Sequence, residues 1–140
     1  MDARDTLRLT ILTTIAAAGA ACKGVFGGQG GIYLLDEYRR GAIGNMPACQ
    51  STDVHVAIWN KLEAGDHAGA RALLNRLLPL IQLETHPFMR YILKRRGVFS
   101  TTVERAPSAL TALDADDKRE ISILIEAIQG DVASYPFGAE

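Results

Sequence analysis

The spacing of apolar residues along the chain predicts a protein that is mostly helical. Leucine and isoleucine recur every three or four residues through several stretches, which is the period of an amphipathic helix. Val54, Ile58 and Leu62 form one such stripe, and Ile121, Leu124, Ile125 and Ile128 form another. The predicted helices cover about residues 5–18, 32–40, 53–64, 67–84, 87–96 and 115–129. Most of them end at a glycine, the residue that most readily leaves a helix with positive φ.

Two short apolar segments interrupt the helical pattern and predict strands. Val25–Phe26 leads into the glycine loop Gly27–Gly31, and a helix follows that loop. Ala42–Met46 ends at Pro47, because proline cannot donate a hydrogen bond to a sheet ladder. Strand, helix, strand and helix in this order make two β/α units, so we expect the two strands to run parallel. Two units cannot close a parallel sheet, and the segment is therefore expected to be part of a larger α/β architecture.

Length and charge restrict the classes of function. The chain has 140 residues, enough for one core, whereas a complete (β/α)8 barrel takes about 250. The formal net charge of −1 gives no electrostatic reason to expect nucleic acid or an anionic membrane as a partner. A basic cluster near the end of the helix 87–96 is interpreted as solvated charge beside the negative end of the helix dipole. Its members are Arg90, Lys94, Arg95 and Arg96.

The cysteines, the histidines and the N-terminal segment exclude further classes. Cys22 and Cys49 form no CxxC pair, which favours a reducing, cytoplasmic location over a disulfide framework. The histidines lack the spacing of a metal-binding helix and are expected at the surface or at helix ends, with no metal; they are His55, His67 and His86. The apolar run Leu7–Ala18 is shorter than the roughly 18 residues that a membrane span needs. Acidic residues before it offset the positive charge that a secretory signal requires.

The loop Gly27–Gly31, with the sequence GGQGG, is the strongest candidate for a ligand site. A dinucleotide-binding loop has the pattern G-x-G-x-x-G, with an acidic residue at the end of the next strand. Gly28 and Gly30 match that pattern, but Tyr33 occupies the third glycine position and Met46 ends the next strand without a carboxylate. The loop also lacks the Lys-Ser/Thr pair of a P-loop. We therefore expect no nucleotide and no other cofactor, and we interpret the glycines first as a tight strand-to-helix turn.

Three segments in order resemble the C-terminal part of the dihydrodipicolinate synthase / N-acetylneuraminate lyase family. They read VFGGQGGIYLLDEYRRGAIGNMPAC, TDVHVAIWNKLEAGDHAGARALLNRLLPL and YILKRRGVFST, and the resemblance extends over about residues 7–128. It implies the last part of a (β/α)8 TIM barrel followed by helices, with Val25–Phe26 as strand seven and Ala42–Met46 as strand eight. It also implies a partial barrel over residues 1–64, a helical extension over 65–130 and a tail over 131–140.

The family implies a chemistry whose central residues do not match this chain. Its members are class I aldolase-type lyases and synthases that form a Schiff base between a lysine and pyruvate or a related 2-oxo acid, and they usually assemble as homo-oligomers. That lysine ends strand six and a catalytic tyrosine lies on strand five, both before the matching segment. No lysine here fits the position, so we assign no catalytic residue; the lysines considered are Lys23, Lys61, Lys94 and Lys118.

The resemblance leaves three residues as candidates for binding a substrate. Gly27, Gly28 and Met46 stand at strand ends, which face the mouth of the barrel where substrates bind. Packing in the barrel interior is the alternative role for Met46. The sequence Asn-Met-Pro at strand eight differs from the Val-Ile-Ser type of the synthases, so sugar-acid dehydratases and aldolases stay open.

Two hypotheses follow for the chain as a whole. The first is a C-terminal fragment of such an enzyme, inactive alone, that associates with the missing N-terminal part or with further copies of itself. The second is a non-catalytic helical module, derived from the family, that serves oligomerisation or partner binding.

Overall fold

The computed structural model describes residues 13, 17–83, 86–105, 112–132 and 137–138. The chain divides into two compact units, residues 1–47 and residues 48–140. The predicted helix over residues 5–18 lies almost entirely outside the described residues. Among the residues described, no helix has both the length and the apolar character needed to cross a membrane.

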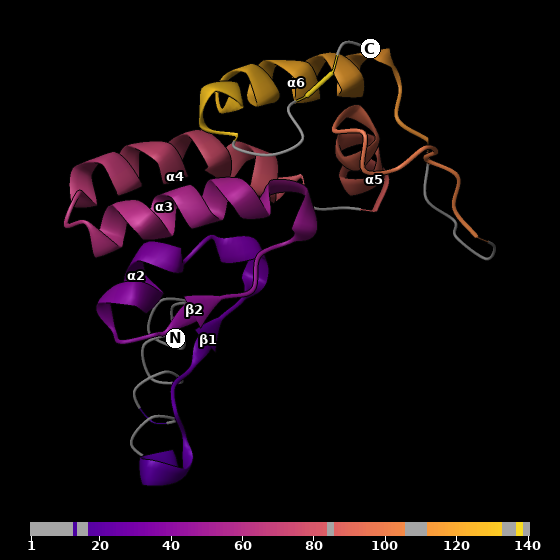
Figure 1. Cartoon of the computed structure of the whole chain (residues 1–140). Coiled ribbons are helices and arrows are strands. Elements are labelled where there is room, and N and C mark those ends of the chain that lie inside the picture. The colour runs from indigo at the N-terminus through magenta and orange to yellow at the C-terminus, as the bar shows by residue number, and fades with distance from the viewer. Residues whose placement is uncertain (1–12, 14–16, 84–85, 106–111, 133–136, 139–140) are drawn as a thin grey trace, which may run out of the picture. The chain divides into compact units, whose positions relative to one another are not determined.

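The first unit contains a short parallel sheet with a connecting helix (Figure 1). Strand β1, Phe26–Gly27, pairs with β2, Gly44–Asn45, in the register Phe26↔Gly44 and Gly27↔Asn45. Two flanking hydrogen bonds of 2.9 Å extend the pairing, from Ile43 N to Val25 O and from Met46 N to Gly27 O. The two predicted strands and their parallel direction are confirmed, although β1 lies one residue after the predicted Val25–Phe26 and β2 is shorter than the predicted Ala42–Met46.

The connection between the strands is a tight turn followed by a short helix. A 3₁₀ turn, η2, covers Gln29–Gly31, and helix α2 covers Leu34–Arg39. Another 3₁₀ turn, η1, covers Gly19–Ala21 before the first strand. Gln29, Gly30 and Gly31 all have positive φ, and the chain reverses its direction in this loop. Glycine occupies two of these three positions, because it adopts positive φ without steric strain.

The two faces of the small sheet differ. Register partners in parallel strands point to the same face, and side chains alternate along a strand. Phe26 therefore shares a face with Gly44 and, two residues on, with Met46, while Gly27 and Asn45 share the other face. The Gly27–Asn45 face is covered by Glu37 of α2, whose carboxyl group contacts Asn45. On the opposite face, Phe26 is 56% exposed and Met46 is 68% exposed.

The second unit is helical. Its helices are α3 Thr52–Glu63, α4 His67–Gln82, α5 His86–Arg95 and α6 Ala115–Glu126, with short 3₁₀ turns η3 Cys49–Ser51 and η4 Gln129–Asp131. Helices α3 and α4 lie side by side and antiparallel, and α4 also contacts α6 (Figure 1). The turn between α3 and α4 uses Gly65 at φ 77°, and the Asp66 carboxylate caps α4 by accepting from Gly69 N at 2.8 Å.

Apolar stripes of these helices form the core, largely as the spacing predicts. Each fully buried leucine or isoleucine contributes roughly 1.5–3 kcal/mol relative to an exposed position. In α4, Leu80 is buried, whereas Leu78 is only partly covered. The buried apolar residues of this unit include Val54, Ile58, Leu62, Leu73, Leu74, Leu77, Ile81, Ile92, Leu93, Ile121, Ile125 and Ile128.

The predicted start of α6 is confirmed in its hydrogen bonds. Asp114 Oδ1 accepts from the backbone N–H groups of Asp116 and Asp117, at 2.8 and 2.9 Å. The Asp117 carboxylate accepts in turn from Asp114 N at 3.0 Å, which completes a capping box.

Arg96 contradicts the interpretation of the basic cluster as solvated charge. Its side chain is only 5% exposed, and its guanidinium binds both carboxylate oxygens of Asp53, at 2.9 and 2.6 Å. It also donates to Gln50 O at 2.6 Å and lies over the ring of Phe137, 5.3 Å from the centroid. The reason is that Arg96 continues the buried face of α5 one turn after Ile92, where Asp53 at the start of α3 supplies the compensating charge.

His55 lies near the start of α3, one of the helix ends at which the histidines were expected, but it is buried and not at the surface. It is 3% exposed, and its Nδ1 lies 2.9 Å from Ser51 O. Its position explains the burial, because His55 lies about one turn before Ile58 and two turns before Leu62, on the buried face of α3. A satisfied histidine in a helix core needs no functional role.

The contrast between two arginine–aspartate pairs gives a test of the packing of the second unit. Asp53 and Asp116 both stand in the first turn of a helix and both pair with an arginine, but the Arg119–Asp116 pair is exposed. Asp53→Ala leaves the buried Arg96 charge uncompensated, and we expect a loss of about 3 kcal/mol in the free energy of unfolding. Asp116→Ala, the matched control, is expected to cost at most about 1 kcal/mol. Equal effects in chemical denaturation would contradict the structural importance of the Arg96 pair.

Candidate functional site

The three predicted pocket residues lie together at the carboxyl ends of the parallel strands. Gly27 is the buried last residue of β1, Gly28 follows it, and Met46 directly follows β2. The hydrogen bond from Met46 N to Gly27 O joins the two strand ends. The structure thus brings these residues into one place, and their role in binding a substrate stays a prediction.

Glu37 is the residue at this place that the sequence pattern did not reveal. Its side chain is 1% exposed and lies between the two strand ends. Its Oε2 accepts from Asn45 Nδ2 at 2.8 Å, and its Oε1 accepts from Gly28 N at 3.4 Å. The available signal was its position three residues after the buried Leu34, which places it on the inner face of α2.

The Glu37 carboxyl group explains why β1 ends in glycine. A Cβ atom at Gly27 would overlap the carboxyl carbon and oxygens of Glu37. Gly27 does not have positive φ, so its backbone conformation would allow a side chain. The close approach of the Glu37 carboxyl group is what excludes one. The glycine loop therefore has a structural cause in addition to the sharp turn at Gly30 and Gly31.

Burial sets the protonation behaviour of Glu37. Desolvation raises the pKa of its carboxyl group from the usual 4.5; the hydrogen bonds from Asn45 and Gly28 oppose this, and the negative charge of Asp36 adds to it. The folded protein consequently binds this proton more tightly than the unfolded chain does. The stability that protonated Glu37 contributes is fully present below about pH 4.5 and is lost as the pH rises through the folded-state pKa.

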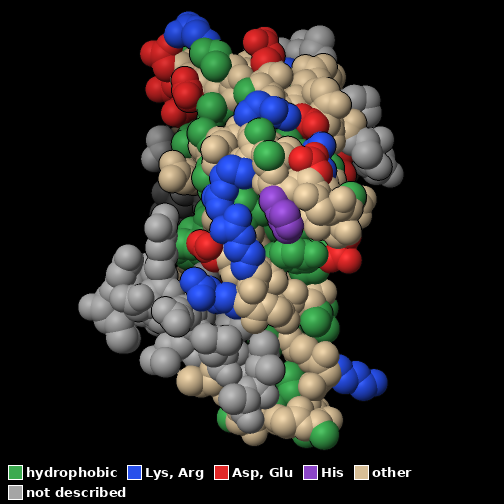
Figure 2. Space-filling view, turned by 90° about the vertical axis from the view of Figure 1, so that its left-hand side faces the viewer, with side chains coloured by type: hydrophobic (Ala, Val, Ile, Leu, Met, Phe, Trp, Pro, Cys, Tyr) green, Lys and Arg blue, Asp and Glu red, His purple; other side chains and the backbone are tan. Residues whose placement is uncertain are grey.

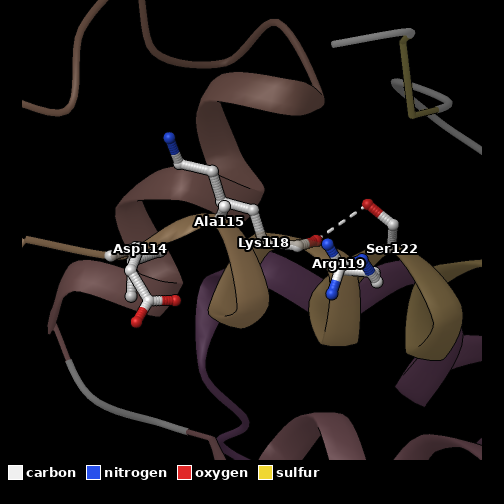
Figure 3. Close-up of a pocket in the computed structure, with 6 residues that line it drawn as sticks. Asp114, Ala115, Lys118, Arg119 and Ser122 are labelled. Carbon is white, nitrogen blue, oxygen red and sulfur yellow. Dashed lines mark hydrogen bonds between the residues drawn. The ribbon is translucent and has the colours of Figure 1, made fainter.

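A hollow of about 540 Å³ lies at the start of α6 in the second unit (Figure 3). Its polar side chains already have partners: Arg119 pairs with Asp116, and the Ser122 hydroxyl donates to Lys118 O at 2.9 Å and accepts from Arg95 at 2.7 Å. No nucleophile–base pair is formed there. The lining residues are Leu113, Asp114, Ala115, Lys118, Arg119 and Ser122.

Among the described residues, the metal-binding side chains add no competing site. Figure 2 shows Lys and Arg side chains beside Asp and Glu side chains on one face of the molecule, in keeping with the net charge of −1. Across the described parts of the chain, no three His, Cys, Asp or Glu side chains gather closely enough to hold a metal ion. The strand ends with Glu37 are therefore the candidate functional site.

A double-mutant cycle tests the contact between Gly27 and Glu37. Gly27→Ala should lower the free energy of unfolding by about 1–3 kcal/mol, because the added methyl group overlaps the carboxyl group. Glu37→Ala should cost about 1–3 kcal/mol, because two partly buried donors lose their acceptor. In the double variant the methyl group occupies the vacated space, so the combined loss should be clearly smaller than the sum. Additive losses in denaturant unfolding would argue against the contact.

Comparisons with known proteins identify a likeness in fold. No family model matches the chain, and no curated protein matches it. The chain is similar in structure to dihydrodipicolinate synthase from Rhodopseudomonas palustris, with 25% sequence identity and a TM-score of 0.69. The match covers 89% of this chain and 42% of the synthase chain, so this chain spans less than half the length of that protein. Its two parallel strands and its helices therefore have the arrangement of part of a dihydrodipicolinate synthase.

Proposed function

We propose that this chain supplies the last two β/α units and the helical extension of a Schiff-base-forming lyase, synthase or dehydratase that acts on pyruvate or a related 2-oxo acid. The observation that carries the proposal is the fold match to a dihydrodipicolinate synthase over 89% of the chain. The parallel β1–β2 pair with its intervening helix supports the proposal, because this is the repeating unit of a (β/α)8 barrel.

In the proposed enzyme, Gly27, Gly28 and Met46 form part of the wall of the 2-oxo acid pocket. Substrates of such barrels bind at the carboxyl ends of the strands, where these three residues lie. Gly28 has space for a ligand close to its backbone, since a Cβ atom there would meet no other atom within 4 Å. Met46 exposes most of its side chain on the face opposite α2.

The reactive lysine of the proposed enzyme comes from outside this chain. In Schiff-base catalysis a neutral lysine amine attacks the ketone, water leaves, and the resulting iminium accepts electrons from the bond that breaks or forms. None of the described lysines is placed at the end of a strand beside Gly27 and Met46. Lys61 pairs with Asp66 at 3.3 Å, and Lys118 lies 6.0 Å from the ring centroid of Tyr91. The chain alone is therefore proposed to be inactive.

The exposed sheet face indicates where the rest of the barrel would attach. Parallel sheets are normally covered on both faces, and two strands alone are marginally stable. Glu37 and α2 cover one face of β1 and β2, while Phe26 and Met46 leave apolar surface exposed on the other. We propose that further parallel strands of a companion polypeptide cover the Phe26–Met46 face, which becomes the barrel interior.

Trapping with borohydride tests this proposal. The chain is incubated with pyruvate and sodium borohydride, both alone and after co-expression with the part of the R. palustris synthase that lies outside the match. The mass of each polypeptide is then measured by mass spectrometry. Borohydride reduces an iminium to a stable secondary amine, so an adduct reports the lysine that formed it. We expect no adduct on this chain in either case and an adduct on the companion when both are present. An adduct on this chain would contradict the proposal.

Paired variants separate the enzyme from a non-catalytic module. Met46→Asp places a charge on the proposed interface and should abolish co-purification, whereas Ile123→Asp, at a similarly exposed apolar position on α6, should not. Co-purification without any adduct would favour the alternative that the chain is a partner-binding module derived from the same fold. Equal behaviour of the two variants would locate the interface elsewhere.

A further inference from the structure

We propose that the Glu37 side chain is a protonation-linked clamp that joins the carboxyl ends of β1 and β2 and positions the backbone of the candidate pocket. Its significance for a 2-oxo acid rests on the proposed function, whereas the clamp itself does not. Glu37 is a positioning residue in this account, because its carboxyl group is buried and acts through its neighbours.

The clamp completes a closed ring of contacts around the strand ends. One oxygen of Glu37 accepts from Gly28 N, immediately after β1, and the other accepts from the side chain of Asn45, in β2. On the ladder side, Met46 N donates to Gly27 O at 2.9 Å. The ring therefore passes from Gly28 through Glu37 and Asn45 to Met46 and back through Gly27. Each predicted pocket residue belongs to it, so a change at Glu37 reaches all three.

The hydrogen bond between Asn45 and Glu37 can form in both protonation states of Glu37. When Glu37 is a carboxylate, Asn45 Nδ2 donates to it, and Asn45 Oδ1 is buried with no hydrogen-bond partner among the described residues. When Glu37 takes up a proton from solvent, its hydroxyl group becomes a donor. Rotation of the Asn45 amide then presents Oδ1 to that hydroxyl group. The same two side chains stay bonded, with the direction of the bond reversed.

The surroundings of Glu37 favour a proton on it at a higher pH than on an ordinary glutamate. The contacts from β1 and β2 are a backbone N–H and an amide, neither of which titrates, and α2 contributes the negative charge of Asp36. Among the residues that the structure describes, none of the groups that influence its carboxyl group is a cation. Burial therefore dominates, and it raises the pKa of Glu37.

Nuclear magnetic resonance of the complete chain tests the clamp. The ¹⁵N-labelled protein is titrated with acid while the backbone amide of Gly28 and the side-chain amide of Asn45 are followed, together with the ¹³C signal of the Glu37 carboxyl group. We expect all three signals to move with one shared midpoint above pH 4.5, and the Asn45 amide signal to show the largest change because its bond reverses.

Two conservative variants provide the controls. Glu37→Gln keeps the shape and hydrogen-bonding capacity but cannot titrate, so the movements at Gly28 and Asn45 should disappear while the fold is retained. Asp36→Asn removes the neighbouring negative charge and should leave the movements in place with a lower midpoint. The proposal is overturned if Gly28 and Asn45 do not follow the Glu37 carboxyl signal in the unmodified chain, a result that needs no variant to fold. Borohydride trapping does not depend on this titration, so the two proposals can fail separately.

Discussion

The parallel pairing of β1 with β2 is the constraint on which the first unit depends. The strands are too short to be stable alone, so the chain between them must bring their ends together and hold them there. The glycine loop reverses the direction of the chain, α2 returns it to the start of β2, and Glu37 bonds to both strand ends. The absence of a side chain at Gly27 follows from the same arrangement, because the Glu37 carboxyl group occupies that space. One buried acid thus connects the loop, the helix and the sheet.

The second unit is held by different forces. Its helices bury continuous apolar stripes, and its main polar contact in the interior is the bidentate pair of Arg96 with Asp53. The pair joins the end of α5 to the start of α3, and Phe137 covers the guanidinium from the C-terminal segment. Such a pair stabilises the fold only while both charges are present, since removal of one leaves the other buried and uncompensated. Within its described residues, this unit has no arrangement of polar side chains comparable with the strand ends of the first.

Periodicity was sufficient to predict the elements, because it reflects local rules. The stripe of Val54, Ile58 and Leu62, the start of α6 at Ala115 and the two β/α units were all recoverable from the spacing of residues. The burial of Arg96, His55 and Glu37 was not, because the spacing of apolar residues does not show which polar side chains find a hydrogen-bond partner inside the fold. Asp53 lies 43 residues from Arg96, a separation that no local pattern encodes. The pocket residues could be placed at strand ends, because the strands were predicted from local patterns. Glu37, the acid that holds those ends, was missed, because its contacts depend on the fold.

Amide hydrogen exchange on the complete chain tests most directly whether these strands form the barrel-like unit. The N–H groups of Ile43 and Met46 donate to Val25 O and Gly27 O across the ladder. The account predicts that both amides exchange much more slowly than the same residues in an unstructured peptide, and that Glu37→Ala accelerates Met46 more than Ile43, because Met46 lies beside the clamp. Exchange of both amides at the rate of an unstructured peptide would contradict the parallel ladder, and with it the assignment of this segment to the end of a barrel.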